Sequence, residues 1–157
     1  MNRRNRTPYF PPEPGSPIPL ASECRRQVRY EECDPLGVVW HGRYASYFED
    51  GRTAFGEKYG LSYMNMFDSS FLAPIVRMYV EYFQPLRFPE EMLIRTELCW
   101  SEVALLNFQY QISGIDGKIR ATGYTVQSLT ERDLQPLLVR PPLLEDFWQR
   151  WSRNELK

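Results

Sequence analysis

A chain of 157 residues with 43% apolar and 15% aromatic residues has the length of one domain and ample material for a hydrophobic core. The formal net charge of −1 and the pI near 5.9 argue against nucleic acid as the main partner, as does the lack of any cluster of Lys and Arg interleaved with aromatic residues. No apolar run approaches the ~20 residues that a membrane-spanning helix needs, so we expect no membrane span.

Residues 1–22 differ in composition from the rest of the chain. They hold six of the thirteen prolines, and three arginines against one glutamate give this segment a charge of +2, which leaves −3 on the remainder. The apolar core of a secretory signal is missing here. We therefore expect a flexible or polyproline-like arm that adds little to the fold, followed by one folded domain over 23–157. A proline-rich recognition ligand is the alternative.

The cysteines and the single histidine restrict the chemistry. Cys24, Cys33 and Cys99 are odd in number and lack CxxC spacing, which favours reduced thiols in a cytoplasmic protein. With one histidine and no Cys/His cluster, the sequence predicts no metal site. Cys33 stands beside Asp34, but without an evident basic partner it is interpreted as a small buried residue rather than a nucleophile.

The most informative segment runs from Asp34 to Tyr44. Asp34-Pro35-Leu36-Gly37 predicts a turn that carries one carboxylate, and a short apolar run and a helix from about Arg43 to Tyr59 follow it. Gly60 stands just past the helix end, where a left-handed cap residue is expected. Aromatic residues at helical spacing predict one buried face, made of Tyr44, Tyr47, Phe48, Phe55 and Tyr59.

The start of this helix lacks a good capping residue. His41-Gly42-Arg43 contains no Ser, Thr, Asp or Asn, and only Gly42 is a tolerable substitute. The first backbone N–H groups are therefore expected to lie open and to carry the partial positive charge of the helix end. Open donors beside a carboxylate suit a reaction in which a carbonyl oxygen becomes negative.

From Leu72 onward the apolar period changes to two, which predicts a run of antiparallel strands. Asp116-Gly117 predicts a hairpin, and Pro141-Pro142 opens a last helix with one apolar face. A strand, a long helix and a run of strands together indicate an α+β layer in which an antiparallel sheet wraps around a long central helix. The predicted strands are a half-buried one over 76–82 and three more over 92–100, 106–112 and about 118–129.

At the residues from Arg29 to Arg52 the sequence resembles the hotdog-fold acyl-CoA thioesterases of the 4-hydroxybenzoyl-CoA thioesterase type. The family pattern is a first strand, Asp-x-x-Gly, two aliphatic residues, an aromatic residue, His or Tyr, then x-x-Tyr and a helix with an acidic residue and Arg. In this chain the pattern reads Arg29-Tyr30 leading into Asp34-Pro35-Leu36-Gly37, Val38-Val39, Trp40, His41 and Tyr44, followed by Phe48-Glu49 and Arg52.

The resemblance implies a hotdog fold and hydrolysis of an acyl or aroyl thioester, of CoA or of an acyl carrier protein, to the free acid and the thiol. It also implies a homodimer, or a dimer of dimers that forms a homotetramer, with the active site at the subunit interface. No metal or redox cofactor is implied, because CoA is part of the substrate. Acyl chain length and aromatic preference do not follow from these residues.

The resemblance also assigns roles to individual residues. Asp34 would attack the thioester or activate water, although an Asp before Pro also simply opens a turn. The N–H groups of His41 and Gly42 would polarise the thioester carbonyl, while the His41 imidazole either acts as a general base or shapes the pocket. The expected substrate-binding residues are Gly37, Val38, Trp40, Tyr44 and Glu49, of which Glu49 can also pair with Arg52 three residues later.

Two alternatives stay open at this point. A hotdog hydratase or dehydratase uses a His general base paired with a carboxylate, and His41 is the one histidine available. In a non-catalytic acyl-binding module, Asp34 would serve the turn alone. The candidates for binding the CoA phosphates are Arg77, Arg87, Arg95 and Arg120.

Overall fold

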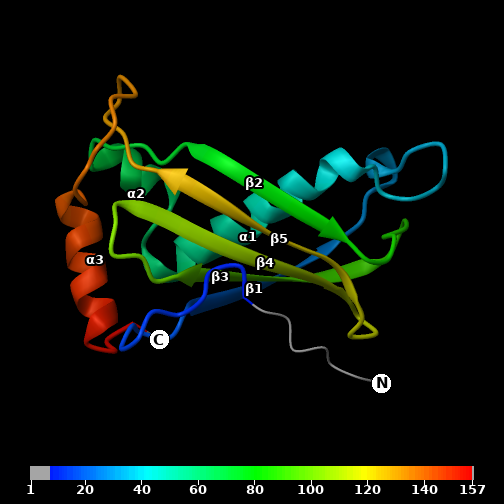
Figure 1. The fold of residues 1–157 in the computed structure, drawn as a ribbon. Helices are drawn as coiled ribbons and strands as arrows, with labels where there is room; N and C mark the ends of the chain where they lie inside the picture. The colour runs from blue at the N-terminus through cyan, green and yellow to red at the C-terminus, as the bar shows by residue number, and fades with distance from the viewer. Residues whose placement is uncertain (1–7, 157) are drawn as a thin grey trace.

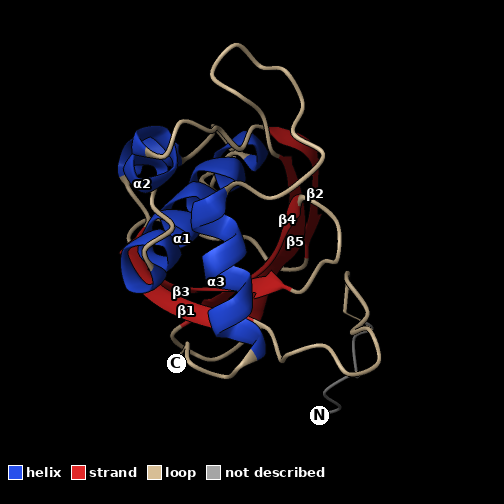
Figure 2. Ribbon diagram, turned by 90° about the vertical axis from the view of Figure 1, so that its left-hand side faces the viewer, coloured by secondary structure: helices blue, strands red, loops and turns tan. Residues whose placement is uncertain are grey.

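The structure, a computed structural model, describes residues 8–156, in which one antiparallel sheet curves around the helix α1 (Tyr44–Tyr59) (Figures 1 and 2). The strands follow the order β1-β3-β4-β5-β2 across the sheet. This arrangement confirms the predicted α+β fold with an antiparallel sheet wrapped around a long central helix. The strands are β1 (Leu20–Gln27), β2 (Ile75–Tyr82), β3 (Glu91–Cys99), β4 (Leu105–Gly114) and β5 (Ile119–Ser128).

Helix α1 packs its aromatic face onto the concave side of the sheet. The Phe48 ring stacks on Tyr110 of β4 with 4.2 Å between the ring centroids, and Phe55 meets Phe108 edge-on at 5.2 Å. Both phenylalanines are fully buried, so this face supplies the centre of the core. Gly60 has φ +74°, and its N–H donates to the carbonyl of Gly56, which confirms the predicted left-handed cap.

The other predicted elements are confirmed with small shifts of their ends. The turn at Asp116-Gly117 joins β4 to β5, with Gly117 at φ +73°. Helix α3 (Pro142–Ser152) crosses one end of the sheet and buries its predicted apolar face (Figure 1). A short helix α2 (Tyr63–Asp68), capped by the Ser62 side chain, was not predicted.

The N-terminal boundary of the folded domain differs from the prediction. Leu20, Ala21 and Ser22 pair with β3, so the arm boundary placed at residue 22 is three residues too late. Strand β1 ends at Gln27, and a 3-10 turn (Tyr30–Glu32) replaces the expected strand at Arg29-Tyr30. The reason is local, because the Glu32 carboxylate accepts the Arg29 N–H and pulls the chain into a turn.

Residues 8–19 contain no helix or strand, but they contact the folded domain. Tyr9 packs against Tyr79 and Tyr124, and its hydroxyl lies 2.7 Å from Thr122 Oγ1. A Cβ on Gly123 would meet Phe48 of α1, so the adjacent Thr122 and Tyr124 face away from the helix. This part of the arm therefore lies on the outer face of the sheet. The arginines of the arm lie outside the described residues, and its flexibility stays a prediction.

Strand β2 is more exposed than the predicted half-buried strand. Val80 is its one half-buried residue, and the other seven are exposed. Within the described residues β2 has β5 as its neighbour on one side and no strand on the other, because it forms the edge of the sheet. The half-buried interpretation is therefore wrong for the single chain.

Candidate active site

Asp34 lies in a tight loop between the 3-10 turn Tyr30–Glu32 and a second 3-10 turn, His41–Arg43, that leads into α1. The backbones of Cys33 and Val39 pair, the Asp34 N–H donates to Val38 O at 2.9 Å, and the Gly37 N–H donates to Asp34 O at 2.9 Å. Gly37 closes the loop at φ +74°, a left-handed conformation that favours glycine. Both ends of the loop are thus fixed by backbone hydrogen bonds.

Only one oxygen of the Asp34 carboxylate takes part in the turn. Its Oδ1 accepts the Leu36 N–H at 2.8 Å, as expected of an Asp that opens a turn. Among residues 8–156, Oδ2 has no hydrogen-bond partner, and the side chain is partly exposed. This oxygen is therefore available to a substrate or a water molecule.

The start of α1 carries the open donors that the sequence predicted. No side chain caps either the 3-10 turn or α1. Within the described part of the chain, the backbone N–H groups of His41 and Gly42 have no acceptor, whereas Arg43 N–H donates to Trp40 O at 2.9 Å. Asp34 and these two amides therefore stand on either side of one short loop, seven and eight residues apart in the sequence.

Trp40 and Gly42 form one packed unit at the helix start. The indole of Trp40 lies so close to Gly42 that a Cβ there would be 2.3 Å from the ring. A side chain at position 42 would therefore displace the indole from this position. The exposed His41 imidazole lies beside the same indole, with 5.1 Å between ring centroids. Among residues 8–156 no carboxylate pairs with this imidazole.

Tyr82, at the end of β2, lies beside the candidate site and was not among the predicted site residues. Its hydroxyl donates to the His41 carbonyl at 2.9 Å, and its ring meets Tyr44 edge-on at 4.9 Å. Burial raises the pKa of Tyr44 to about 12, so this phenol is uncharged at neutral pH and lines the candidate site as a neutral side chain. The sequence carried no signal for Tyr82 beyond its place in an aromatic-rich strand.

Glu49 lies apart from the Asp34 loop within one chain. It is exposed and pairs with Arg52, whose Nη1 also donates to the Tyr110 hydroxyl at 3.0 Å. Glu49 lies five residues into α1 from Tyr44, a rise of ~7.5 Å along the helix away from its start. The structure thus groups Asp34, Gly37, Val38, Trp40, His41, Gly42 and Tyr44, and it leaves Glu49 in a second place, where its role in binding stays a prediction.

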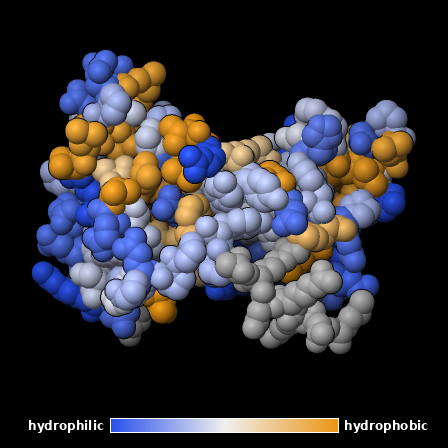
Figure 3. All heavy atoms as spheres, in the orientation of Figure 1, coloured by the Kyte–Doolittle hydropathy of each residue, from blue (hydrophilic) through white to orange (hydrophobic). Residues whose placement is uncertain are grey.

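Glu49 and Arg52 mark the polar end of a pocket of about 260 Å³ between α1, α2 and the sheet. The rest of this pocket, named here the helix pocket, is mostly apolar and is lined by Leu61, Tyr63, Met66, Leu72, Ala73, Pro74, Phe108 and Leu134, with Thr53 and Gln127. Apolar side chains also gather on the surface around α2 and the loop after β5 (Figure 3), among them the exposed Met64, Leu134 and Leu138. The helix pocket has the character of a site for an apolar chain.

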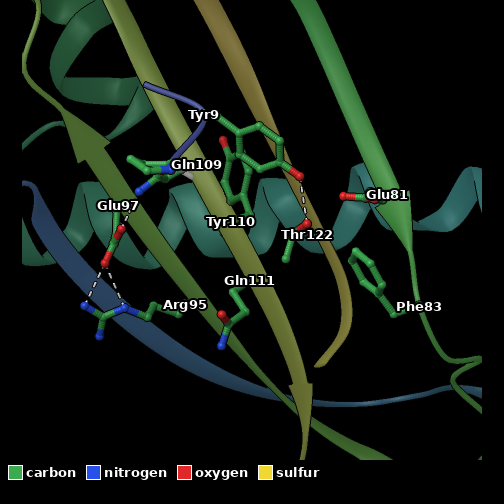
Figure 4. Close-up of a pocket in the computed structure, with 10 residues that line it drawn as sticks. Tyr9, Glu81, Phe83, Arg95, Glu97, Gln109, Tyr110, Gln111 and Thr122 are labelled. Carbon is green, nitrogen blue, oxygen red and sulfur yellow. Dashed lines mark hydrogen bonds and ion pairs between the residues drawn. The ribbon is translucent and has the colours of Figure 1, made fainter. Parts of the chain in front are cut away.

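A larger cavity of about 480 Å³ lies on the outer face of the sheet (Figure 4). Its charged groups are largely satisfied, because Arg95 pairs with Glu97 and Glu97 accepts a hydrogen bond from Gln109. Of the predicted site residues it contains Arg95, a candidate for the CoA phosphates, but none of the residues of the Asp34 loop or the start of α1. The cavity is therefore not part of the candidate active site.

Of the four arginines considered for CoA phosphates, two are held by carboxylates. Arg95 pairs with Glu23 and Glu97, and Arg120 pairs with Glu90 and Asp116. Arg87 is exposed and lies beside the Asp34 loop, with Nη1 3.4 Å from Gly37 O. Arg77 is exposed on β2.

Residues 8–156 contain neither a clustered set of metal-ligating side chains nor a helix that could span a membrane. No group of three or more His, Cys, Asp or Glu side chains in this range is arranged to hold a metal ion. In the same range no helix has the length and apolar character to cross a membrane.

Comparison with known proteins places this geometry in a family context. The family model described as "Thioesterase-like superfamily" matches residues 28–151. The putative acyl-CoA thioesterase YneP of Bacillus subtilis is 36% identical over 70 residues, 45% of this chain and 51% of that protein. The acyl-CoA thioester hydrolase YbgC of Escherichia coli O157:H7 is 31% identical over 72 residues, 46% of this chain and 54% of that protein. The matches span about half the length of these curated relatives.

The fold comparison extends over nearly the whole chain. The DHNA-CoA thioesterase of Staphylococcus aureus superposes with a TM-score of 0.77 at 26% identity, covering 87% of this chain and 95% of that one. The protein TT1821 of Thermus thermophilus superposes with a TM-score of 0.73 at 29% identity, covering 87% and 99%. The predicted hotdog fold is confirmed by the first of these likenesses.

Proposed function

This chain belongs to the thioesterase-like superfamily, and from that premise we propose that it hydrolyses an acyl or aroyl thioester of CoA to the free acid and the thiol. One observation carries the proposal. A carboxylate with one available oxygen, on Asp34, and two unpaired N–H groups, of His41 and Gly42, stand on either side of a single short loop. The relatives named for acyl-CoA thioester hydrolysis support this reading of the geometry.

The proposed reaction uses the two halves of the loop for different tasks. The thioester carbonyl oxygen accepts hydrogen bonds from the His41 and Gly42 amides, which stabilise the negative charge that develops on it. Asp34 either attacks the carbonyl carbon or removes a proton from an attacking water. The carbon–sulfur bond then breaks, and the thiolate leaves and takes up a proton. When water attacks, it supplies the second oxygen of the acid directly; when Asp34 attacks, water hydrolyses the resulting acyl–Asp34 anhydride and releases the acid and the free carboxylate. Both roles of Asp34 require the charged carboxylate.

The edge strand β2 supports the proposal of a homodimer. Its exposed residues include Val76 and Tyr79, and an uncovered aromatic edge favours association with another strand. A two-fold axis centred on β2 would place the end of one copy's strand beside the start of the other's. Tyr82 at the end of β2 holds the helix start, and Ala73-Pro74 before β2 lines the helix pocket. In such a dimer the Asp34 loop of one copy would face the helix pocket of the other.

This dimer would also give Glu49, Arg52 and Arg87 a role in substrate binding. The acyl chain would enter the partner's helix pocket, with Glu49 and Arg52 at the polar end, which accounts for their separation from Asp34 within one chain. The exposed Arg87 beside Gly37 would meet the CoA phosphates, which favours CoA over a carrier protein. A dimer of dimers is part of the same proposal. The described cysteines are all free thiols, which supports a cytoplasmic location.

The test is a hydrolysis panel that measures thiol release from acyl-CoAs of increasing chain length and from aroyl-CoAs, with wild type and Asp34→Asn side by side. We expect turnover of at least one class by wild type and its loss in the variant. Hydration of 2-enoyl-CoA in the absence of thiol release would instead establish the hydratase alternative. Binding of acyl-CoA with no turnover of any substrate would establish the acyl-binding module.

A further inference from the structure

A buried carboxylate that the proposed reaction does not use lies two residues before Asp34. Glu32 is 3% exposed, although the adjacent Glu31 is exposed. Its Oε1 accepts from Arg26 Nη2 at 2.7 Å, and its Oε2 accepts from the Tyr47 hydroxyl at 3.0 Å and the Arg29 N–H at 2.8 Å. The donors come from β1, from α1 and from the segment that opens the 3-10 turn, so this one side chain joins three parts of the fold.

The backbone of Glu32 also connects to the side of the loop that carries the His41 and Gly42 amides. Its carbonyl accepts the Trp40 N–H at 2.9 Å, and the next residue, Cys33, pairs with Val39. The two ends of the Asp34 loop therefore meet at Glu32. Asp34 follows it by two residues on one side, and His41 follows Trp40 directly on the other.

The surroundings supply the charge that a buried carboxylate requires. Arg26 pairs with Glu32 and with Asp50, and its guanidinium lies 4.8 Å from the centre of the Tyr47 ring. Tyr47 is fully buried, and burial and the hydrogen bond to Glu32 raise the pKa of its phenol, so it stays a donor at neutral pH. Each oxygen of Glu32 thus has a fixed partner.

We propose that Glu32 is a positioning residue for the hydrolysis: its carboxylate holds the base of the loop against β1 and α1, and so sets Asp34 relative to the amides of His41 and Gly42. The inference rests on the proposed function of those residues. A carboxylate and its oxyanion donors act on the same carbonyl group, so a displacement of about 1 Å between them can cost about a hundredfold in rate. A buried ion pair is weak evidence for stability in itself, which is a reason to look for its role in geometry.

The test compares Glu32→Gln with Glu31→Gln, the same change one position away on an exposed side chain that pairs with Arg29 at 3.8 Å. In Glu32→Gln the amide nitrogen must face a donor, so the contacts cannot all form. We expect kcat to fall about ten- to hundredfold with KM within about threefold of wild type. Glu31→Gln should stay within about twofold of wild type in both constants.

A double-variant comparison separates positioning from a general loss of stability. If Glu32 acts through Asp34, Glu32→Gln should cost less than about threefold in an Asp34→Asn background, where the group that it positions is already removed. An equal cost in both backgrounds, or a Glu32→Gln enzyme with more than half of the wild-type kcat, would overturn the proposal.

Amide hydrogen exchange tests the same point without relying on activity. The Asp34, Gly37 and Trp40 amides, which close the loop, should exchange at least about tenfold faster in Glu32→Gln, while the amides of β3 and β4 keep their wild-type rates. Unchanged loop exchange would contradict the inference. If Asp34→Asn proves fully active, the proposed function fails, and hydrogen exchange still decides what Glu32 does to the loop.

Tyr47→Phe carries the test if Glu32→Gln does not fold. This change removes one of the three donors to Glu32 and leaves the pairing with Arg26. We expect kcat to fall about three- to tenfold, again with little change in KM and with faster exchange confined to the loop. Wild-type kcat and wild-type loop exchange in this variant would overturn the proposal.

Discussion

The Tyr82 hydroxyl donates a hydrogen bond to the backbone carbonyl of His41, with 2.9 Å between the two oxygens. This contact joins the end of the exposed edge strand to the turn that starts α1. The same turn presents the unpaired amides of His41 and Gly42. The edge that we propose for association and the donors that we propose for catalysis are therefore parts of one connected unit.

Asp34→Asn should lower turnover at least about a hundredfold, because an amide can neither attack the thioester nor act as a base. Thermal stability should change little, since the Asn side-chain oxygen can still accept the Leu36 N–H. Steady-state hydrolysis and a thermal melt measure the two effects. Cys33→Ala serves as the control and should remain active. More than a tenth of wild-type activity in Asp34→Asn would remove the catalytic assignment.

Tyr82→Phe should lower kcat/KM about three- to tenfold, because the His41 carbonyl loses its hydrogen bond while the ring keeps its contact with Tyr44. The expected loss of unfolding free energy is about 0.5–1.5 kcal/mol or less, since the group is partly exposed. Tyr124→Phe is the matched control, as its hydroxyl has no hydrogen-bond partner among residues 8–156. Equal kinetics in the two variants would show that this hydrogen bond does not support the site.

Val76→Lys should convert a homodimer to a monomer and remove activity with it, because β2 pairing places two like charges near one axis. Sedimentation velocity at micromolar concentration and hydrolysis measured on the same sample test this expectation. Val103→Lys is a control of similar exposure, 59% against 61% for Val76, in the turn before β4. A wild-type protein that is a fully active monomer would contradict an interfacial site.

Tyr9→Ala should lower the free energy of unfolding by about 1–2 kcal/mol, because it removes two aromatic contacts and a hydrogen bond on the outer face of the sheet. Activity should stay within about threefold of wild type, since Tyr9 packs on Tyr79 and Tyr124 on the outer face of the sheet. Urea denaturation measures the first effect, and limited proteolysis shows whether the arm is cut sooner. Wild-type stability of Tyr9→Ala would indicate that this segment is only loosely attached to the folded domain.

Alkaline pH should destabilise the protein partly through Tyr44. Burial raises the pKa of this phenol from 10.0 to about 12 in the folded state. The folded state therefore holds the proton more tightly, and the resulting stability is complete below about pH 10 and is lost as the pH rises towards 12. Urea denaturation at several pH values should show a steeper decline for wild type than for Tyr44→Phe. Parallel declines would contradict this contribution.

Several features follow from short stretches of sequence, because their physical causes are local. The Asp34 turn depends on Asp, Pro and Gly at fixed offsets, and the Asp116-Gly117 hairpin on a glycine that adopts positive φ. The helix over Tyr44–Tyr59 and its unpaired first amides follow from aromatic spacing and the lack of a capping residue. Because the turn and the helix start are separated by only a few residues, the sequence also predicts that the carboxylate and the open donors lie near one another.

The tertiary structure alone decided which distant side chains hold these stretches in place. Glu31 and Glu32 are chemically identical neighbours, yet one is exposed and the other is buried among donors from distant segments. No local pattern separates them, because the burial of Glu32 depends on where β1 and α1 cross. In the same way, sheet order made β2 an edge strand and brought Tyr82 to His41, 41 residues away in the sequence. Residue types and spacing determined the chemistry of the loop, and the packing of distant elements determined how that chemistry is held in place.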